Sequence, residues 1–146
     1  MHHRLNRRTL LGSALAGTTL AGTARVWAQK GEVMRPRIAA VVTEYTENSH
    51  ADVIVTKFLE GYNTREVDFQ PRVQVVSLYL DQRPVRDIGV ETAHRHRLRL
   101  APTIEDALTL GTGTLAVDGV LLIGEHGRYP YNELGQHLYP RRRFFD

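Results

Sequence analysis

Two polar segments hold the side chains of this sequence that could do chemistry. One runs from residue 43 to 50 and the other from residue 125 to 132, and each directly follows an apolar run. If both runs are parallel strands, their carboxyl ends meet at one edge of a sheet, where α/β proteins bind their ligands. The sequence therefore predicts a crevice between these two segments.

Glu125 and His126 are the candidate catalytic pair in the second segment. A carboxylate beside an imidazole at the mouth of a crevice can exchange protons with a substrate or ligate a metal ion. Residues that only cap the local backbone would produce the same pattern, so both interpretations stay open. We expect no metal site, because no His-x-x-x-His or His-Glu-x-x-His spacing accompanies His50, Glu125 and His126.

Further candidates for ligand binding come from the ends of three predicted strands. A histidine at the start of a helix can donate a hydrogen bond to a phosphate or carboxylate, or it can simply pack. A loop rich in tyrosine and amide groups suits sugars and other small polar molecules, or it packs as a structural arm. The predicted ligand-binding residues are Glu44, Tyr45, His50, Asp81 and Tyr129.

Strands and helices alternate along the chain from residue 37 to 146. Apolar, β-branched runs predict strands at 38–42, 73–80, 98–101 and 117–124, the last of them buried. Helices are predicted from the N-cap Ser49 to Gly61, over about 87–96, and from the N-cap Thr103 to Gly111. This alternation predicts an α/β fold, a Rossmann-like doubly wound parallel sheet with the strand order 3-2-1-4.

The last 22 residues show no helical pattern. They end in Arg141-Arg142-Arg143-Phe144-Phe145-Asp146. A run of arginines at a chain end is usually solvated. We therefore expect two exposed phenylalanines and an uncovered last strand, either because the chain is the amino-terminal part of a longer protein or because a partner covers this edge.

The first 28 residues have the three-part pattern of an export signal. Arg7 and Arg8 precede a weakly apolar run, and Ala28 precedes the expected mature start at Gln29. The pattern predicts recognition by the twin-arginine translocation machinery, cleavage after residue 28, a linker over 29–36 and a periplasmic location. The run is too short and too polar to predict a stable membrane span.

Charge and cysteine content exclude some classes of function. Four of the 19 basic residues lie before residue 29 and no acidic residue does, so 15 basic residues face 16 acidic ones in the predicted mature chain. A domain so close to neutral has no electrostatic footprint for nucleic acid. The chain contains no cysteine, which excludes disulfides and thiolate metal sites.

Several segments resemble the amino-terminal domain of the glucose-fructose oxidoreductase and inositol dehydrogenase family. Other segments resemble a second group more closely, which consists of exported bacterial proteins that are of uncharacterised function and longer than this chain. The first resemblance rests on 38–42, 49–51, Asp81, 103–108 and 117–123, and the second on 50–54, 123–130 and 139–140. The family resemblance implies a Rossmann-like fold, a sugar or polyol substrate, an NAD or NADP cofactor and a contact of Asp81 with a ribose hydroxyl.

The sequence departs from that family at the phosphate-binding turn. Dinucleotide-binding domains place a Gly-x-Gly-x-x-Gly motif there, whereas this chain has Thr43, Glu44, Tyr45 and Glu47 and no glycine. Two carboxylates would repel a pyrophosphate. Two functions therefore stay open: an exported oxidoreductase-like protein acting on a sugar or polyol, and a periplasmic protein that binds another small molecule on the same scaffold.

Overall fold

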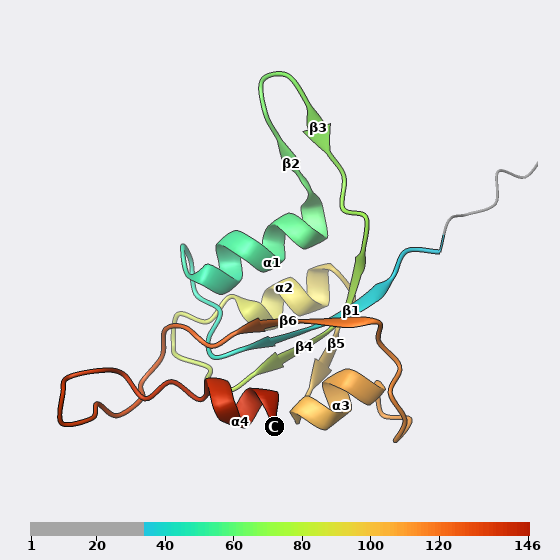
Figure 1. The fold of residues 1–146 in the computed structure, drawn as a ribbon. Coiled ribbons are helices and arrows are strands. Elements are labelled where there is room, and N and C mark those ends of the chain that lie inside the picture. The colour runs from blue at the N-terminus through green and yellow to red at the C-terminus, as the bar shows by residue number, and fades with distance from the viewer. Residues whose placement is uncertain (1–33) are drawn as a thin grey trace, which may run out of the picture. The chain divides into compact units, whose positions relative to one another are not determined.

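A four-stranded parallel sheet forms the centre of the molecule (Figure 1). Its strands are β1 (Arg37–Val42), β4 (Gln74–Leu80), β5 (Arg99–Ala101) and β6 (Gly119–Ile123), in the spatial order β5-β4-β1-β6. The predicted α/β class is confirmed. The computed structural model describes residues 34–146, so the predicted signal residues Arg7, Arg8 and Ala28 lie outside the described residues.

Helices lie on both faces of the sheet (Figure 1), an arrangement consistent with a Rossmann-like fold. On one face α1 (His50–Glu60) packs against β4 and β6, and α2 (Gly89–Arg95) against β4 and β5. On the other face α3 (Ile104–Thr109) packs against β1, β4 and β5, and α4 (Arg141–Phe145) against β6. Within residues 34–146, none of the helices combines the length and apolar character that a membrane crossing requires.

Strand β1 is the most deeply buried element of the sheet. It pairs with β4 along one edge and with β6 along the other, so its backbone donors and acceptors are satisfied by the sheet. Ala40 and Val42 belong to the core beneath α1 and α2, whereas Ala39 packs with Ala107 on the α3 face. The continuous apolar run of the sequence thus reflects burial on both faces.

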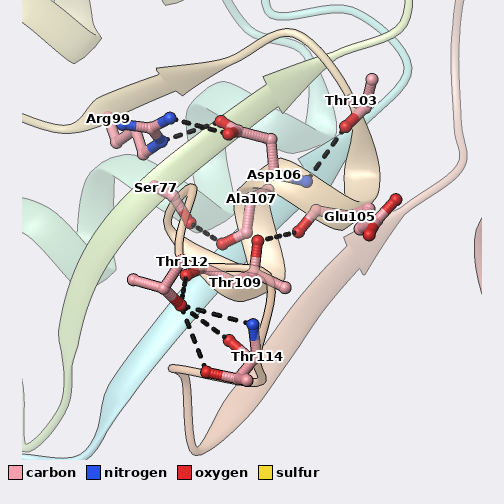
Figure 2. Close-up of polar contacts among 9 residues, drawn as sticks. All are labelled: Ser77, Arg99, Thr103, Glu105, Asp106, Ala107, Thr109, Thr112 and Thr114. Carbon is pink, nitrogen blue, oxygen red and sulfur yellow. Dashed lines mark hydrogen bonds and ion pairs between the residues drawn. The ribbon is translucent and has the colours of Figure 1, made fainter.

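Capping side chains determine where α1 and α3 begin. The Ser49 side chain accepts a hydrogen bond from the Asp52 amide, and α1 ends at Gly61, which has a φ of 77°. Thr103 accepts from the Asp106 amide in the same way (Figure 2). Both predicted N-caps are confirmed.

Two further contacts hold α3 against the sheet (Figure 2). Arg99 on β5 forms a two-pronged ion pair with Asp106, at 2.8 Å from Nε and 2.7 Å from Nη2. The Ser77 hydroxyl on β4 donates to the Ala107 carbonyl over 2.7 Å and is fully buried. Ser77, a polar residue in the middle of the predicted strand, therefore links the sheet to α3 by a hydrogen bond.

A short hairpin that the sequence pattern did not predict separates α1 from β4. Its strands are β2 (Tyr62–Asn63) and β3 (Asp68–Phe69), which pair antiparallel and extend away from the sheet (Figure 1). Thr64 closes the turn, because its amide donates to the Val67 carbonyl and its hydroxyl accepts from the Val67 amide. Strands of two residues are too short for alternation to reveal them.

The chain end corrects the prediction of two exposed phenylalanines. Residues Arg141–Phe145 form α4, and Phe144 is 6% exposed whereas Phe145 is 84% exposed. The Phe144 ring meets Tyr79 of β4 edge to face, with centroids 6.1 Å apart. The arginine run is also not merely solvated, because Arg141 pairs with Glu125 and Arg143 with Asp81.

Strand β6 is less buried than its sequence indicated. It occupies an edge of the sheet, and Val120 is 46% exposed although Ile123 is buried. An edge strand has a neighbour on only one side, so an apolar run on it need not be covered on both faces. The predicted burial of the whole strand was therefore wrong.

We expect Phe144→Ala to lower the free energy of unfolding by roughly 3 kcal/mol, because it empties the contact between α4 and Tyr79. The matched control is Phe145→Ala, which alters an exposed ring of the same size and should change stability by less than about 0.5 kcal/mol. Urea unfolding followed by circular dichroism measures both. Equal effects of the two variants would contradict the packing of α4.

Candidate ligand-binding crevice

A polar cavity of about 360 Å³ lies at the carboxyl ends of β1 and β6, and we call it the crevice. It adjoins a second cavity of about 520 Å³ beside the loop that follows β4, with which it shares Glu44, Pro84, Arg86 and Arg128. Parallel sheets bind ligands at this edge. The residues lining the crevice are Glu44, Pro84, Arg86, His126, Gly127, Arg128, His137 and Tyr139.

Glu44 is the buried acid of the crevice. It follows β1 directly and is only 8% exposed. No ion pair joins its carboxylate to another of residues 34–146, although Arg86 and Arg128 line the same cavity. The residue as a whole is buried, but its oxygens are not among the buried side-chain atoms without a partner, so they are open to the cavity, where a ligand can reach them.

His137 contributes a second polar group without a partner. Its Nδ1 atom is buried and forms no hydrogen bond within residues 34–146. The ring stacks on Tyr139, with centroids 4.9 Å apart and planes 9° from parallel. The Leu138 amide donates to the Pro130 carbonyl over 2.9 Å and helps to hold this segment in place. The crevice therefore has an aromatic wall, whereas the unpaired Nδ1 atom itself is buried.

His50 and His126 come together at the edge of the crevice. Nδ1 of His50 at the start of α1 lies 2.8 Å from Nε2 of His126, and the ring centroids are 4.8 Å apart. Such a contact needs one N–H and one lone pair, so at least one of the two rings is neutral. Two predicted site residues that are 76 positions apart in the chain are thus neighbours.

The loop after β6 is held in a restricted conformation around His126. His126 has a φ of 67° and Gly127 a φ of 100°, and a Cβ atom at Gly127 would lie 2.7 Å from the Tyr129 ring. The Gln82 side chain binds the Arg128 backbone twice, accepting from its amide over 2.9 Å and donating to its carbonyl over 3.0 Å. Left-handed backbone at a non-glycine residue is uncommon and is often found at functional sites.

Glu125 does not form a dyad with His126. Its carboxylate pairs with Arg141, and its backbone carbonyl accepts a hydrogen bond from the Thr43 hydroxyl. The two predicted catalytic residues consequently belong to different contacts, because Glu125 binds α4 whereas His126 binds His50.

Asp81 and Tyr129 are brought together, but in a closed network. Asp81 follows β4 and accepts hydrogen bonds from Tyr79 at 2.8 Å, from Tyr129 at 2.7 Å and from Arg143, which reaches both carboxylate oxygens at 2.8 Å. Burial favours the neutral acid, but the bonds from Arg143, Tyr129 and Tyr79 outweigh it and lower the pKa of Asp81. Burial and the nearby carboxylate raise the pKa of Tyr129.

Tyr45 is a core residue, which corrects its prediction as a ligand-binding group. It is fully buried, and its hydroxyl lies 2.7 Å from the hydroxyl of Thr56 on α1. Burial raises the pKa of Tyr45 to about 12. The side chain has no exposed surface to offer a ligand.

The residues do not fit a dinucleotide. The Asp52 amide in the first turn of α1 already donates to the Ser49 hydroxyl, and the Asn48 amide just before α1 donates to Asp52 Oδ2 over 2.9 Å. Those amides are the groups that would hold a pyrophosphate, and Asp52 and Glu44 place negative charge beside that position. Asp81, which would meet a ribose hydroxyl, is fully engaged by Arg143 and the two tyrosines.

Sequence reasoning identified part of the crevice and missed the rest. Glu44 and His126 were predicted, whereas the roles of Arg86, Arg128 and His137 were not. The first two follow strand ends, a positional signal that was available, but His137 arrives from a distant loop. In residues 34–146, no three histidine or acidic side chains are grouped closely enough to hold a metal ion.

We expect Asp81→Asn to destabilise the protein by roughly 2 kcal/mol at pH 7, because it weakens hydrogen bonds to a charged group. The lowered pKa means that the stabilisation is present above the ordinary aspartate pKa and disappears as the pH falls through the lower folded-state value. Urea unfolding should therefore show a gap in stability between wild type and variant at pH 5–7 that narrows as the pH falls below the ordinary aspartate pKa. The exposed control Glu47→Gln should show no gap at pH 7, and a gap for Asp81→Asn that is independent of pH would contradict the network.

Comparison of the chain with protein-family models, with curated proteins and with solved structures found no match. The resemblance to sugar and polyol oxidoreductases therefore stays a prediction. What the domain does has to be inferred from the crevice itself.

Proposed function

We propose that this domain binds a small sugar or polyol in the crevice, with a preference for an anionic form such as a sugar acid. The observation that carries the proposal is the Glu44 carboxylate, which lines the same cavity as the cations Arg86 and Arg128 without an ion pair to another of residues 34–146. A hydroxyl group of the ligand would donate a hydrogen bond to this carboxylate.

The other walls of the crevice match the same class of ligand. Arg86 and Arg128 provide donors that pair with a carboxylate or phosphate. The stacked rings of His137 and Tyr139 offer an aromatic surface beside them. Binding sites for small molecules combine such surfaces with a few polar groups that orient the ligand.

Of the two functions that the sequence left open, ligand binding without a dinucleotide is the better supported. The Asp52 amide in the first turn of α1 and the Asn48 amide just before the helix are bound by the chain's own side chains, and Asp81 is occupied by Arg143. His126 lines the crevice and can exchange a proton with His50, so it is the residue for any acid–base chemistry at this site. Glu125 supports the loop through Arg141.

Export to the periplasm is part of the proposal. Arg7 and Arg8 ahead of the apolar run, Ala28 before the expected cleavage site and the near-neutral chain that follows all support it. A Rossmann-like, doubly wound scaffold suits this route, because the twin-arginine machinery carries folded proteins. The absence of cysteine is compatible with folding before export.

We expect the full chain to bind gluconate more tightly than glucose or inositol in isothermal titration, and to bind neither NAD nor NADP. Glu44→Gln should weaken gluconate binding by about 10-fold because it removes a charged acceptor for a ligand hydroxyl, and Arg86→Gln should do so because it removes a charged donor to the ligand carboxylate. Arg65→Gln, on the hairpin and outside the crevice, is the matched control and should bind like the wild type.

Two results would contradict the binding proposal. Loss of affinity in the Arg65→Gln control as large as that in Arg86→Gln would mean that only overall charge matters. Heat of binding with NAD that Glu44→Gln abolishes would instead assign the crevice to a dinucleotide.

We expect replacement of Arg7 and Arg8 by lysine to leave the chain in the cytoplasm, since the charge is kept but the arginine pair is lost. Arg4→Lys, which conserves the pair, is the control and should be exported. Cell fractionation with mass spectrometry of the amino terminus measures both, and the exported form should begin at Gln29. Export of the double variant at the wild-type level would exclude the twin-arginine route.

A further inference from the structure

An apolar groove lies between α1 and the hairpin that follows it, and it shares no residue with the crevice. It is bounded by α1, by the β2–β3 hairpin and by the segment that leads into β4, and its volume is about 490 Å³. The hairpin extends beyond the end of α1 (Figure 1). The groove is lined by Val53, Ile54, Lys57, Phe58, Gly61, Tyr62, Phe69, Gln70, Pro71 and Arg72.

Large apolar side chains in the groove are exposed to solvent, and covering them with an apolar ligand would be energetically favourable. Val53 is 50% exposed, Tyr62 46% and Phe69 42%. The Tyr62 and Phe69 rings stack across the hairpin, with centroids 4.6 Å apart and planes 17° from parallel. Contiguous exposed apolar surface of this kind marks a binding site more often than isolated exposed residues do.

The backbone around the groove is held by hydrogen bonds. The Gly61 amide donates to the Lys57 carbonyl over 2.9 Å at the end of α1. The Thr64 amide donates to the Val67 carbonyl over 2.8 Å in the turn, and the Arg35 guanidinium donates to the Pro71 carbonyl over 3.2 Å. The two walls are therefore formed before any ligand arrives, which lowers the entropic cost of binding.

The charged side chains that line the groove are all positive. Its lining includes two cations, Lys57 and Arg72, and no carboxylate. Neither cation forms an ion pair with another of residues 34–146. The Lys57 ammonium lies 5.6 Å from the centre of the Tyr62 ring, so positive charge sits directly beside the aromatic surface.

We propose that this groove binds an amphipathic carboxylate, a molecule with a hydrocarbon tail and an anionic head, such as a medium-chain fatty acid. The tail lies along the apolar side chains between α1 and the hairpin, and the head pairs with Lys57 and Arg72, the two cations of the lining. The volume falls in the range of pockets that hold small organic molecules, roughly 300–1,000 Å³. This site is independent of the crevice and of the sugar-binding function proposed for it.

We test the proposal by titrating the full chain with decanoate, decanol and decyltrimethylammonium, which share the tail and differ in charge. Decanoate should bind tightest and the cation weakest. Lys57→Gln and Arg72→Gln should each weaken decanoate binding by roughly threefold, and by about 10-fold together, without changing the affinity for decanol. Arg65→Gln, at the hairpin turn and outside the groove, is the matched control.

The comparison of decanoate with decanol separates loss of a charge contact from loss of folding, because an unfolded groove would bind neither molecule. Equal affinities for decanoate and the cationic analogue would overturn the proposal, as would variants in which decanoate and decanol binding fall together. Dimerisation in analytical ultracentrifugation that Phe69→Ser abolishes, without decanoate binding, would assign the groove to a second copy of the chain and also overturn it. Gluconate binding in the crevice serves as a separate readout, because the failure of one site does not imply failure of the other.

Discussion

The pairing of β1 on both of its edges is the constraint on which the rest of the structure depends. Because β4 and β6 satisfy its backbone groups, β1 can lie between two layers of helices, and four of its residues are at most 1% exposed. Its small residues Ala39 and Ala40 leave room for α3 on one face and for the α1 and α2 core on the other. The same parallel arrangement brings the loops after β1, β4 and β6 to one edge, so the crevice is a consequence of how the core is built.

At that edge, the polar groups divide into a closed network and an open cavity. Asp81 is surrounded by Tyr79, Tyr129 and Arg143, and its hydrogen-bonding capacity is used within the chain. Glu44 and His137 border the crevice without such partners. The network around Asp81 contributes to stability, whereas the crevice is available to a ligand. The sequence does not distinguish the two, because residues of both follow strands of the sheet.

The C-terminal helix connects these two regions. Phe144 anchors α4 on Tyr79, and from that position Arg141 reaches Glu125 and Arg143 reaches Asp81. Glu125 and Asp81 both follow strands at the edge of the sheet where α/β proteins bind their ligands, and each is paired with an arginine of α4. The hairpin before β4 has a different role, because it forms one wall of the apolar groove beside α1, which shares no residue with the crevice.

Local sequence determined the elements that depend on neighbouring residues. The helix after Ser49, its end at Gly61, the cap at Thr103 and the parallel strands are readable because capping and hydrophobic periodicity act over a few positions. The sequence could also place Glu44 and His126 at one edge, since that follows from the alternation of strands and helices. It could not show that Tyr45 is buried, that Asp81 binds Arg143 or that His137 enters the crevice, because those contacts join distant residues, 62 positions apart for Asp81 and Arg143. Tertiary structure alone decided which polar groups are satisfied within the chain and which remain for a ligand, because a hydrogen-bond partner is chosen by distance in space.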